Sequence, residues 1–228
     1  MPPPSAVLFD IGDTLLEEQR FDLEAGINAV VANDAEVVLL AAEFRNALEE
    51  CHAENREPLL AQWLQARVPA LAAFTIPHIE DRIWRVVVTL VPRTDVSLVL
   101  TRLAADGVPV GAVSNAAFSG RVLRAELARH GLADSLRFVV SSADLDSRKP
   151  AALIFETAVT RLGVAASSTW FVGDTLSEDI AGAARAGLQP IWFSTGTEPA
   201  SVPCTVPLVR SWPAFLTLYQ ASINAPAG

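Results

Sequence analysis

Cysteine and histidine are scarce in this chain of 228 residues. The only cysteines, Cys51 and Cys204, lie far apart, and two of them cannot build the disulfide framework of a small secreted domain. We expect two buried free thiols, with a disulfide between them as the less favoured alternative. His52, His78 and His130 do not have the spacing of metal ligands, which excludes a zinc site built from cysteine and histidine.

Long hydrophobic runs and a signal segment are also absent. Hydrophobic residues make up 51% of the chain, which excludes a disordered protein. No uninterrupted apolar stretch approaches the roughly 18 residues that span a bilayer. Residues 1–5 lack the basic and apolar regions of a secretory signal. We therefore expect a cytoplasmic protein without a membrane partner.

Positive charge is scarce as well. The net charge is −9, the sequence pI is about 4.8, and there is no basic stripe, which argues against a nucleic-acid partner. A phosphorylated small molecule is compatible with this balance, because a bound metal and local cations set the potential at a site. The sequence does not choose between a monomer and a homodimer.

From residue 91 onward the chain alternates between strand and helix patterns. Short apolar strands are predicted at 6–9, 108–113, 137–141, 170–172 and 190–193. Helices are predicted at 96–103, 118–130, 151–162, 180–186 and 212–219. Regular alternation predicts an α/β fold with a doubly wound parallel sheet, a Rossmann-like core with helices on both faces. Ligands of such sheets bind at the carboxyl ends of the strands.

Residues 16–90 show helical periodicity and little strand character. Helices are predicted at 21–31, 36–50, 59–67 and 79–90, separated by prolines. We predict a smaller all-helical domain at 16–90, inserted into a core domain formed by 1–15 and 91–228. The segments Glu17–Glu18 and Val91–Arg93 are candidate hinges, and a helical extension that does not move is the alternative.

Acidic side chains follow two of the predicted strands. Asp10 ends the run 6–9, and a carboxylate at the tip of a buried strand is well placed for nucleophilic attack. Asp174 follows the strand 170–172, and Asp179 begins the next helix. Helix capping alone would explain Asp179 but not Asp174. Since parallel strands share a carboxyl edge, the three carboxylates form a hard-oxygen site that suits Mg²⁺.

Two further segments carry groups that suit a phosphoryl substrate. Ser114 and Asn115 follow the strand 108–113, where a hydroxyl and exposed backbone N–H groups can bind phosphoryl oxygens. Lys149 precedes a helix that starts at Pro150, where the helix dipole is already positive, so an anion should compensate its charge. Taken separately, helix capping and a solvated lysine explain these residues at least as well.

In this order along the chain, the four segments resemble the four signatures of the haloacid dehalogenase superfamily. Flanking runs at 148–150, 154–156 and 183–187 agree with the same family. The predicted helical insertion, directly after the first signature, is similar in position to the cap of the phosphatase-like branch. The resemblance implies a hydrolase that acts on a small phosphorylated metabolite, with Mg²⁺ as cofactor.

The resemblance also implies roles for individual residues. It assigns catalysis to Asp10, Ser114, Lys149 and Asp179, substrate binding to Ser114, Asn115 and Lys149, and metal binding to Asp10, Gly12 and Asp174. Asp10 would attack phosphorus and form an aspartyl-phosphate, and Gly12 would contribute its backbone carbonyl. Asp179 would orient Lys149 or a metal-bound water. These residues would act by positioning the reacting groups and by stabilising charge, as phosphoryl transfer requires.

The chain departs from this family at Gly12. The phosphatases usually have there a second Asp, which protonates the leaving group and then activates water, and such help is typically worth about 10²–10⁴-fold. Asp13 stands one place later, where a side chain has a different direction. Three outcomes are open. Asp13, Glu17 or Glu18 supplies the proton; or the substrate has a good leaving group, such as an acyl or aryl phosphate; or turnover is slow or absent.

Two other functions compete with phosphate hydrolysis. Dehalogenases of the superfamily also lack the second Asp, but they need no magnesium, so Asp174 argues against that branch. The phosphonate-cleaving branch uses a cap lysine, and residues 16–90 contain none. A non-catalytic phosphate-binding or regulatory protein is the other alternative. The sequence does not identify the substrate, although Arg20, Arg45 and Arg56 are candidate anion contacts.

Overall fold

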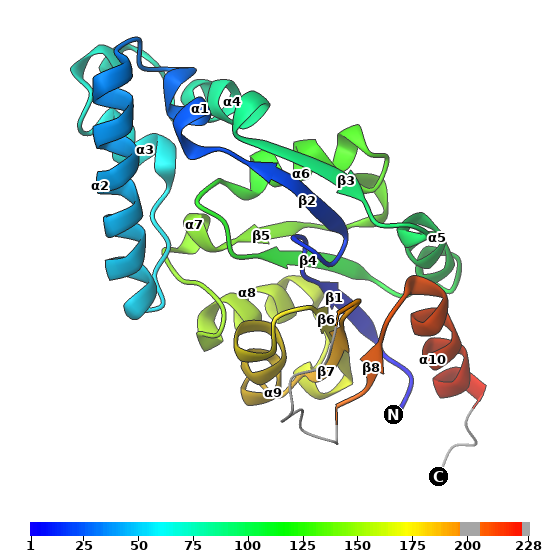
Figure 1. Ribbon diagram of the computed structural model, residues 1–228. Coiled ribbons are helices and arrows are strands. Elements are labelled where there is room, and N and C mark those ends of the chain that lie inside the picture. Colours follow the sequence, from blue (N-terminus) through cyan, green and yellow to red (C-terminus); the bar gives the residue numbers. More distant parts are fainter. Residues whose placement is uncertain (197–205, 225–228) are drawn as a thin grey trace.

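The centre of the structure is one parallel sheet (Figure 1). The computed structural model describes residues 1–196 and 206–224, so Cys204 and part of the Pro-rich tail lie outside the described residues. Six strands pair in the order β5-β4-β1-β6-β7-β8, all of them parallel. They are β1 (Ala6–Phe9), β4 (Val110–Ser114), β5 (Val139–Ser141), β6 (Thr169–Gly173), β7 (Gln189–Phe193) and β8 (Leu208–Val209). The predicted α/β core is confirmed, and β8 was not predicted.

Helices cover both faces of this sheet. One face carries α5 (Val96–Ala105), α6 (Gly120–Arg129) and α10 (Trp212–Asn224), and the other carries α8 (Ala152–Leu162) and α9 (Ala181–Arg185). The residues of β1 alternate between the two layers: Val7 and Phe9 join the first apolar cluster, and Ala6 and Leu8 join the second. An unbroken apolar strand of this kind is stable only when helices bury both of its sides.

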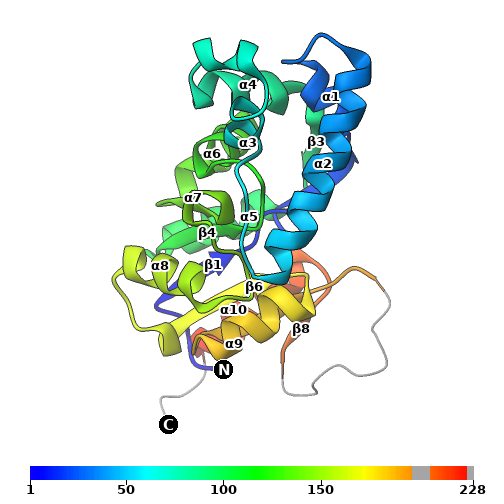
Figure 2. The ribbon, with the colours of Figure 1, turned by 90° about the vertical axis from the view of Figure 1, so that its left-hand side faces the viewer.

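The insertion between β1 and α5 stands over the sheet and is mainly helical (Figure 2). Its helices are α1 (Leu23–Asn28), α2 (Asp34–Ala53), α3 (Leu60–Gln65) and α4 (Ile76–Val87), with a 3-10 helix η1 at Pro69–Ala73. These helices pack around an apolar cluster of their own, which includes Ile27, Phe44 and Leu64. Phe118, from the loop that follows β4, completes this cluster.

The sequence predicts an all-helical insertion, but the structure shows that two of its segments are strands. β2 (Leu16–Phe21) and β3 (Val88–Pro92) pair antiparallel and form a two-stranded ribbon between insertion and core. The candidate hinges, Glu17–Glu18 and Val91–Arg93, lie in or next to this ribbon, and residues 88–90 are strand rather than helix. β2 is mostly polar and its partner lies at the far end of the insertion. Neither local periodicity nor a turn signal marks such a pair.

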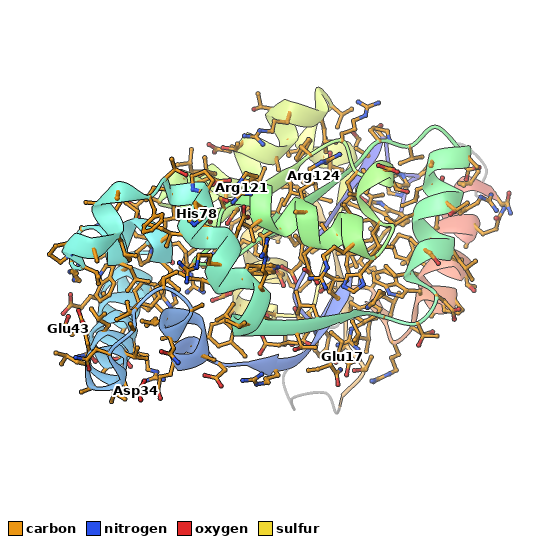
Figure 3. The ribbon with its side chains drawn as sticks, turned by 90° about the horizontal axis from the view of Figure 1, so that it is seen from above. Glu17, Asp34, Glu43, His78, Arg121 and Arg124 are labelled. Carbon is orange, nitrogen blue, oxygen red and sulfur yellow. The ribbon has the colours of Figure 1, made fainter. Side chains whose placement is uncertain are left out.

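A second connection joins the insertion to the core, through α4 and α6. Glu80 on α4 is buried and accepts hydrogen bonds from the N–H and hydroxyl of Ser119, at 2.7 and 2.8 Å. Ser119 is the N-cap residue of α6, so Glu80 satisfies its N–H as the Glu of a capping box would. Further along, the Trp84 indole donates to Glu126 at 3.0 Å. Arg121 on α6 also lies against α4 (Figure 3).

The helix α10 packs directly behind the first strand. The ring of Phe9 lies 5.6 Å from the Trp212 ring and 5.9 Å from the Phe215 ring, measured between centroids. Tyr219 on the same helix donates a hydrogen bond to Asp106 at 2.9 Å. The residue before Asp10 is therefore held by aromatic packing. Within 1–196 and 206–224, no helix has the length and hydropathy to traverse a bilayer.

Candidate active site

The residues predicted for the site meet at the carboxyl edge of the sheet. Asp10 follows β1, Ser114 ends β4 and Asp174 follows β6. Because β1 lies between β4 and β6, parallel pairing brings these three side chains to one place. They line a polar cavity of about 190 Å³ with the other predicted residues. The lining residues are Asp10, Gly12, Asp13, Ser114, Asn115, Lys149, Asp174, Thr175, Glu178 and Asp179.

Lys149 is buried among these groups and is the only lysine in the sequence. Its Nζ lies 2.5 Å from Asp10 Oδ1 and 2.6 Å from Asp179 Oδ1, and it donates to the Val113 carbonyl at 3.3 Å. Burial by itself lowers the pKa of the Lys149 ammonium. The charges of Asp10 and Asp179 outweigh this effect and hold that pKa above its ordinary value. Lys149 is therefore a fixed cation facing two carboxylates.

The backbone after β6 turns Asp179 back onto the strand end. Asp179 lies in a π-helical turn, η4 (Leu176–Ile180), and such turns are frequent at functional sites. Its Oδ2 accepts a hydrogen bond from the N–H of Thr175 at 3.0 Å. A Cβ on Gly173 would stand 2.5 Å from the Asp179 carboxyl group. The close approach of Asp179 to the strand thus requires glycine at the end of β6.

Negative charge exceeds positive charge in the polar cavity. Oxygens of Asp10, Asp174 and Asp179 lie within 4.8 Å of one another, and Lys149 is the one cation among the described lining residues. Burial, opposed by the charge of Lys149 and reinforced by Asp179, raises the pKa of Asp10 to about 8. Burial and the charge of Asp179 raise the pKa of Asp174 to about 6. Carboxylates held together against their mutual repulsion suit a divalent cation.

Gly12 leaves open space in this cavity, because a Cβ there would meet no atom within 4 Å. Asp13 does not fill that space. Its φ is 52°, and its Oδ1 lies 3.5 Å from Arg93 Nη2 and 3.4 Å from the N–H of Glu18. Glu17 also faces Arg93, with 3.7 Å between Oε2 and Nη1. Asp13 thus lines the polar cavity while its carboxylate is engaged by Arg93, as is that of Glu17.

The Asn115 side chain is used to hold the loop that carries Lys149. Its amide donates to the Lys149 carbonyl at 3.0 Å and to Glu178 at 2.8 Å, and its oxygen accepts from the Lys149 N–H at 2.7 Å. These bonds occupy the side chain that the sequence analysis assigned to substrate binding. We therefore propose that the Asn115 side chain positions Lys149.

An ion-pair chain that was not predicted links the insertion to the same loop. Arg148 Nε lies 3.0 Å from Glu57 Oε2, and Arg148 Nη2 lies 3.1 Å from Glu178 Oε1. Glu57 belongs to the insertion and is only 4% exposed. Its partner is distant in sequence, so no local pattern marks it. The only sequence feature that could have pointed to this ion-pair chain is the position of Arg148 directly before Lys149.

The three insertion arginines considered as anion contacts are engaged with acids. The pairs are Arg20 with Asp22 at 2.7 Å, Arg45 with Glu24 at 3.1 Å and Arg56 with Asp146 at 2.7 Å. The described lining of the polar cavity includes none of these arginines. The structure therefore gives them no place at the candidate site.

Known proteins resemble this chain in sequence and in fold. A family model, haloacid dehalogenase-like hydrolase, matches residues 4–187. The chain is 32% identical over 203 residues to a protein of Methanopyrus kandleri named glyceraldehyde 3-phosphate phosphatase, covering 84% of each chain. A solved HAD phosphatase from Thermococcus onnurineus is similar with a TM-score of 0.60 and 21% identity, covering 96% of this chain and 97% of that one. A solved dehalogenase with an intermediate complex has a TM-score of 0.64 and 21% identity, covering 96% and 98%. At this identity the two structures are similar in fold alone.

Proposed function

Because this chain belongs to the haloacid dehalogenase-like hydrolases, we propose that it is a magnesium-dependent phosphohydrolase of a small phosphorylated metabolite. The Methanopyrus kandleri relative, named as a phosphatase, supports a phosphoryl substrate. One observation carries the proposal: Asp10, Lys149 and Asp174, from three separate stretches of chain, line one polar cavity. A carboxylate nucleophile, a fixed cation and a further metal-binding acid are the parts that phosphoryl transfer needs.

The donor set around Asp10 fits Mg²⁺. The side chains of Asp10 and Asp174 and the carbonyl of Gly12 offer oxygen ligands, and magnesium takes few protein ligands of this type and keeps waters. When bound, the ion would supply charge neutralisation for the carboxylates and the phosphoryl group. Asp179 has its oxygens engaged by Lys149 and by the N–H of Thr175, so we assign it the orientation of Lys149.

The proposed reaction has two displacements at phosphorus. An oxygen of Asp10 attacks phosphorus, the bond to the ester oxygen breaks, and the leaving alkoxide takes up a proton. Water then attacks the resulting aspartyl-phosphate, loses a proton, and releases inorganic phosphate and the Asp10 carboxylate. Lys149 neutralises charge on the phosphoryl oxygens, and the Ser114 hydroxyl donates a hydrogen bond to one of them.

We assign the proton donor to Glu18, in place of the acid that position 12 lacks. Asp13 lines the polar cavity, but its carboxylate lies 3.5 Å from Arg93 Nη2, and that of Glu17 lies 3.7 Å from Arg93 Nη1. Glu18 instead lines, together with Gly12, a second cavity that adjoins the polar one. Burial, with the charge of Asp13 adding to it, raises the pKa of the Glu18 carboxyl. A raised pKa is the direction that a general acid needs near neutral pH.

Two alternatives keep some support. Gly12 favours a slow or inactive relative that binds phosphate, since the usual acid is missing there. Dehalogenation is less well supported, because Asp174 adds negative charge next to Asp10, which suits a bound cation rather than attack on a neutral carbon. Tight phosphate binding without product would favour the inactive relative.

The test is hydrolysis of p-nitrophenyl phosphate and acetyl phosphate in the presence of Mg²⁺. We expect Asp10→Asn to lower kcat by roughly 10³-fold or more, because the amide oxygen is a poor nucleophile. Asp34→Asn, which changes an exposed acid at the start of α2, is the matched control and should leave kcat unchanged. Equal turnover by wild type and Asp10→Asn, or none by wild type over a broad phosphate panel, would contradict the proposal.

A further inference from the structure

The second cavity differs in character from the polar one. Its volume is about 270 Å³, and it lies between the insertion and the core. Apolar side chains from both parts line it, among them Phe21, Leu48, Trp84, Val88, Leu90 and Phe118. The rings of Trp84 and Phe118 pack edge to face with centroids 4.9 Å apart. Since a cavity of about 150 Å³ with apolar walls binds benzene, this one has room for a ring-sized group.

Arg148, Glu57 and His52 at this cavity are engaged in ion pairs and hydrogen bonds. Arg148 pairs with Glu57 and Glu178, and His52 Nε2 lies 3.1 Å from Glu57 Oε1. Glu18 contributes a further acid to the lining. Among the described lining residues, no cation is left to receive a second phosphate or a carboxylate of a substrate.

The two cavities share part of their walls. Gly12, Ser114 and Asn115 line both of them. A substrate whose phosphoryl group lies next to Asp10 therefore has the apolar cavity as the adjoining space for the rest of the molecule. At Gly12 this shared wall carries no side chain, and a Cβ there would meet no atom within 4 Å.

We propose that the apolar cavity binds the leaving group, and that the substrates are monophosphate esters of uncharged alcohols with an apolar or aromatic body. This inference rests on the proposed phosphohydrolase function. A polyhydroxylated leaving group would lose hydrogen bonds against the walls that Trp84 and Phe118 form. A second phosphate would meet Glu18 without a free cation beside it. An aryl leaving group would in addition need less protonation, which suits the missing acid at Gly12.

The experiment compares benzyl phosphate with glycerol 3-phosphate, whose leaving alkoxides are similarly basic, so that a difference reports the body of the leaving group. With Mg²⁺ present, we expect kcat/KM to be at least about tenfold higher for benzyl phosphate. Phe21→Ala should reduce that ratio roughly tenfold. Phe21 is 52% exposed, so the variant should fold. Phe74→Ala, at an exposed phenylalanine elsewhere on the insertion, is the control and should not change the ratio.

Binding of two non-hydrolysable probes separates failure of this inference from failure of the proposed function. Calorimetry with benzylphosphonate and methylphosphonate should show a preference for the benzyl compound that Phe21→Ala removes. Such a preference without turnover of any ester would support the cavity assignment and end the phosphohydrolase proposal. Turnover without preference for the benzyl compounds, in kinetics and in binding, would overturn the cavity assignment and leave the phosphohydrolase proposal standing.

Discussion

Gly12 is the residue at which we propose that the chemistry of this protein departs from its family, and Glu18 lines the apolar cavity together with Gly12. We expect Glu18→Gln to lower kcat for benzyl phosphate by about 10²-fold, because that leaving group needs a proton. The same change should leave hydrolysis of p-nitrophenyl phosphate nearly unaffected, since nitrophenolate leaves without one. Steady-state kinetics with both esters measures the difference.

A second substitution and a control test that assignment. Gly12→Asp in the Glu18→Gln protein should restore much of the benzyl phosphate activity, since a Cβ at Gly12 meets no atom within 4 Å. Glu17→Gln is the matched control, because Glu17 faces Arg93 instead. Equal losses for both esters in Glu18→Gln, or an equal loss in Glu17→Gln, would be incompatible with proton donation by Glu18.

The sequence located Asp10, Ser114 and Asp174 because each follows a short apolar run, and the tips of parallel strands share an edge. The direction of Asp13 could not be read in this way, because its positive φ and its contact with Arg93 depend on the folded loop. Residues that meet only through the tertiary fold leave no periodicity in the chain, and the pairing of Glu57 with Arg148 is of this kind.

Among the elements, α4 and α6 fasten the insertion to the core. Glu80 is buried at this contact and holds the N–H and hydroxyl of Ser119. We expect Glu80→Gln to lower the free energy of unfolding by about 1–3 kcal/mol, because charge-assisted hydrogen bonds at the start of α6 are weakened. Glu43→Gln, at an exposed position of α2 (Figure 3), should change it by less than about 0.5 kcal/mol.

Urea unfolding followed by circular dichroism measures both variants. Equal stability of Glu80→Gln and Glu43→Gln would show that the contact is not a stabilising one. The α4–α6 contacts favour an insertion that is fixed on the core, which is the alternative to hinge motion at the ribbon.

The four helices of the insertion were predictable because each has a local apolar stripe. The ribbon of β2 and β3 was not, because its register depends on a partner across the whole insertion.

For the whole molecule, the acids gathered at one edge of the sheet make stability depend on pH. The pKa values of Asp10 and Asp174 are about 8 and about 6 in the folded protein, against 3.8 for an exposed Asp. Between about pH 4 and about pH 8 the folded protein therefore holds protons that the unfolded chain has released. The contribution of these groups to stability is greatest at acid pH and is lost as the pH rises through this range.

We expect the Tm of the metal-free protein to fall from about pH 5 to about pH 8 for this reason. Mg²⁺ should raise Tm most at the alkaline end, because its ligands are then unprotonated and the unfolded chain offers no such site. Asp174→Asn should flatten the fall and remove the Mg²⁺ effect. Scanning calorimetry with and without Mg²⁺ gives the comparison. A Mg²⁺ shift of the same size in wild type and Asp174→Asn would rule out this metal site.

The first strand of the chain is also the central strand of the sheet, and this order matters during translation. Ala6–Phe9 leaves the ribosome long before Val110–Ser114 and Thr169–Gly173, the segments that hydrogen-bond to it. Parallel pairing between such distant segments is slow to form. The nascent chain thus carries an unpaired apolar strand through much of its synthesis, and this exposed strand makes it prone to aggregation. The helical insertion is made next and packs around an apolar cluster of its own, so it can fold before the sheet is complete.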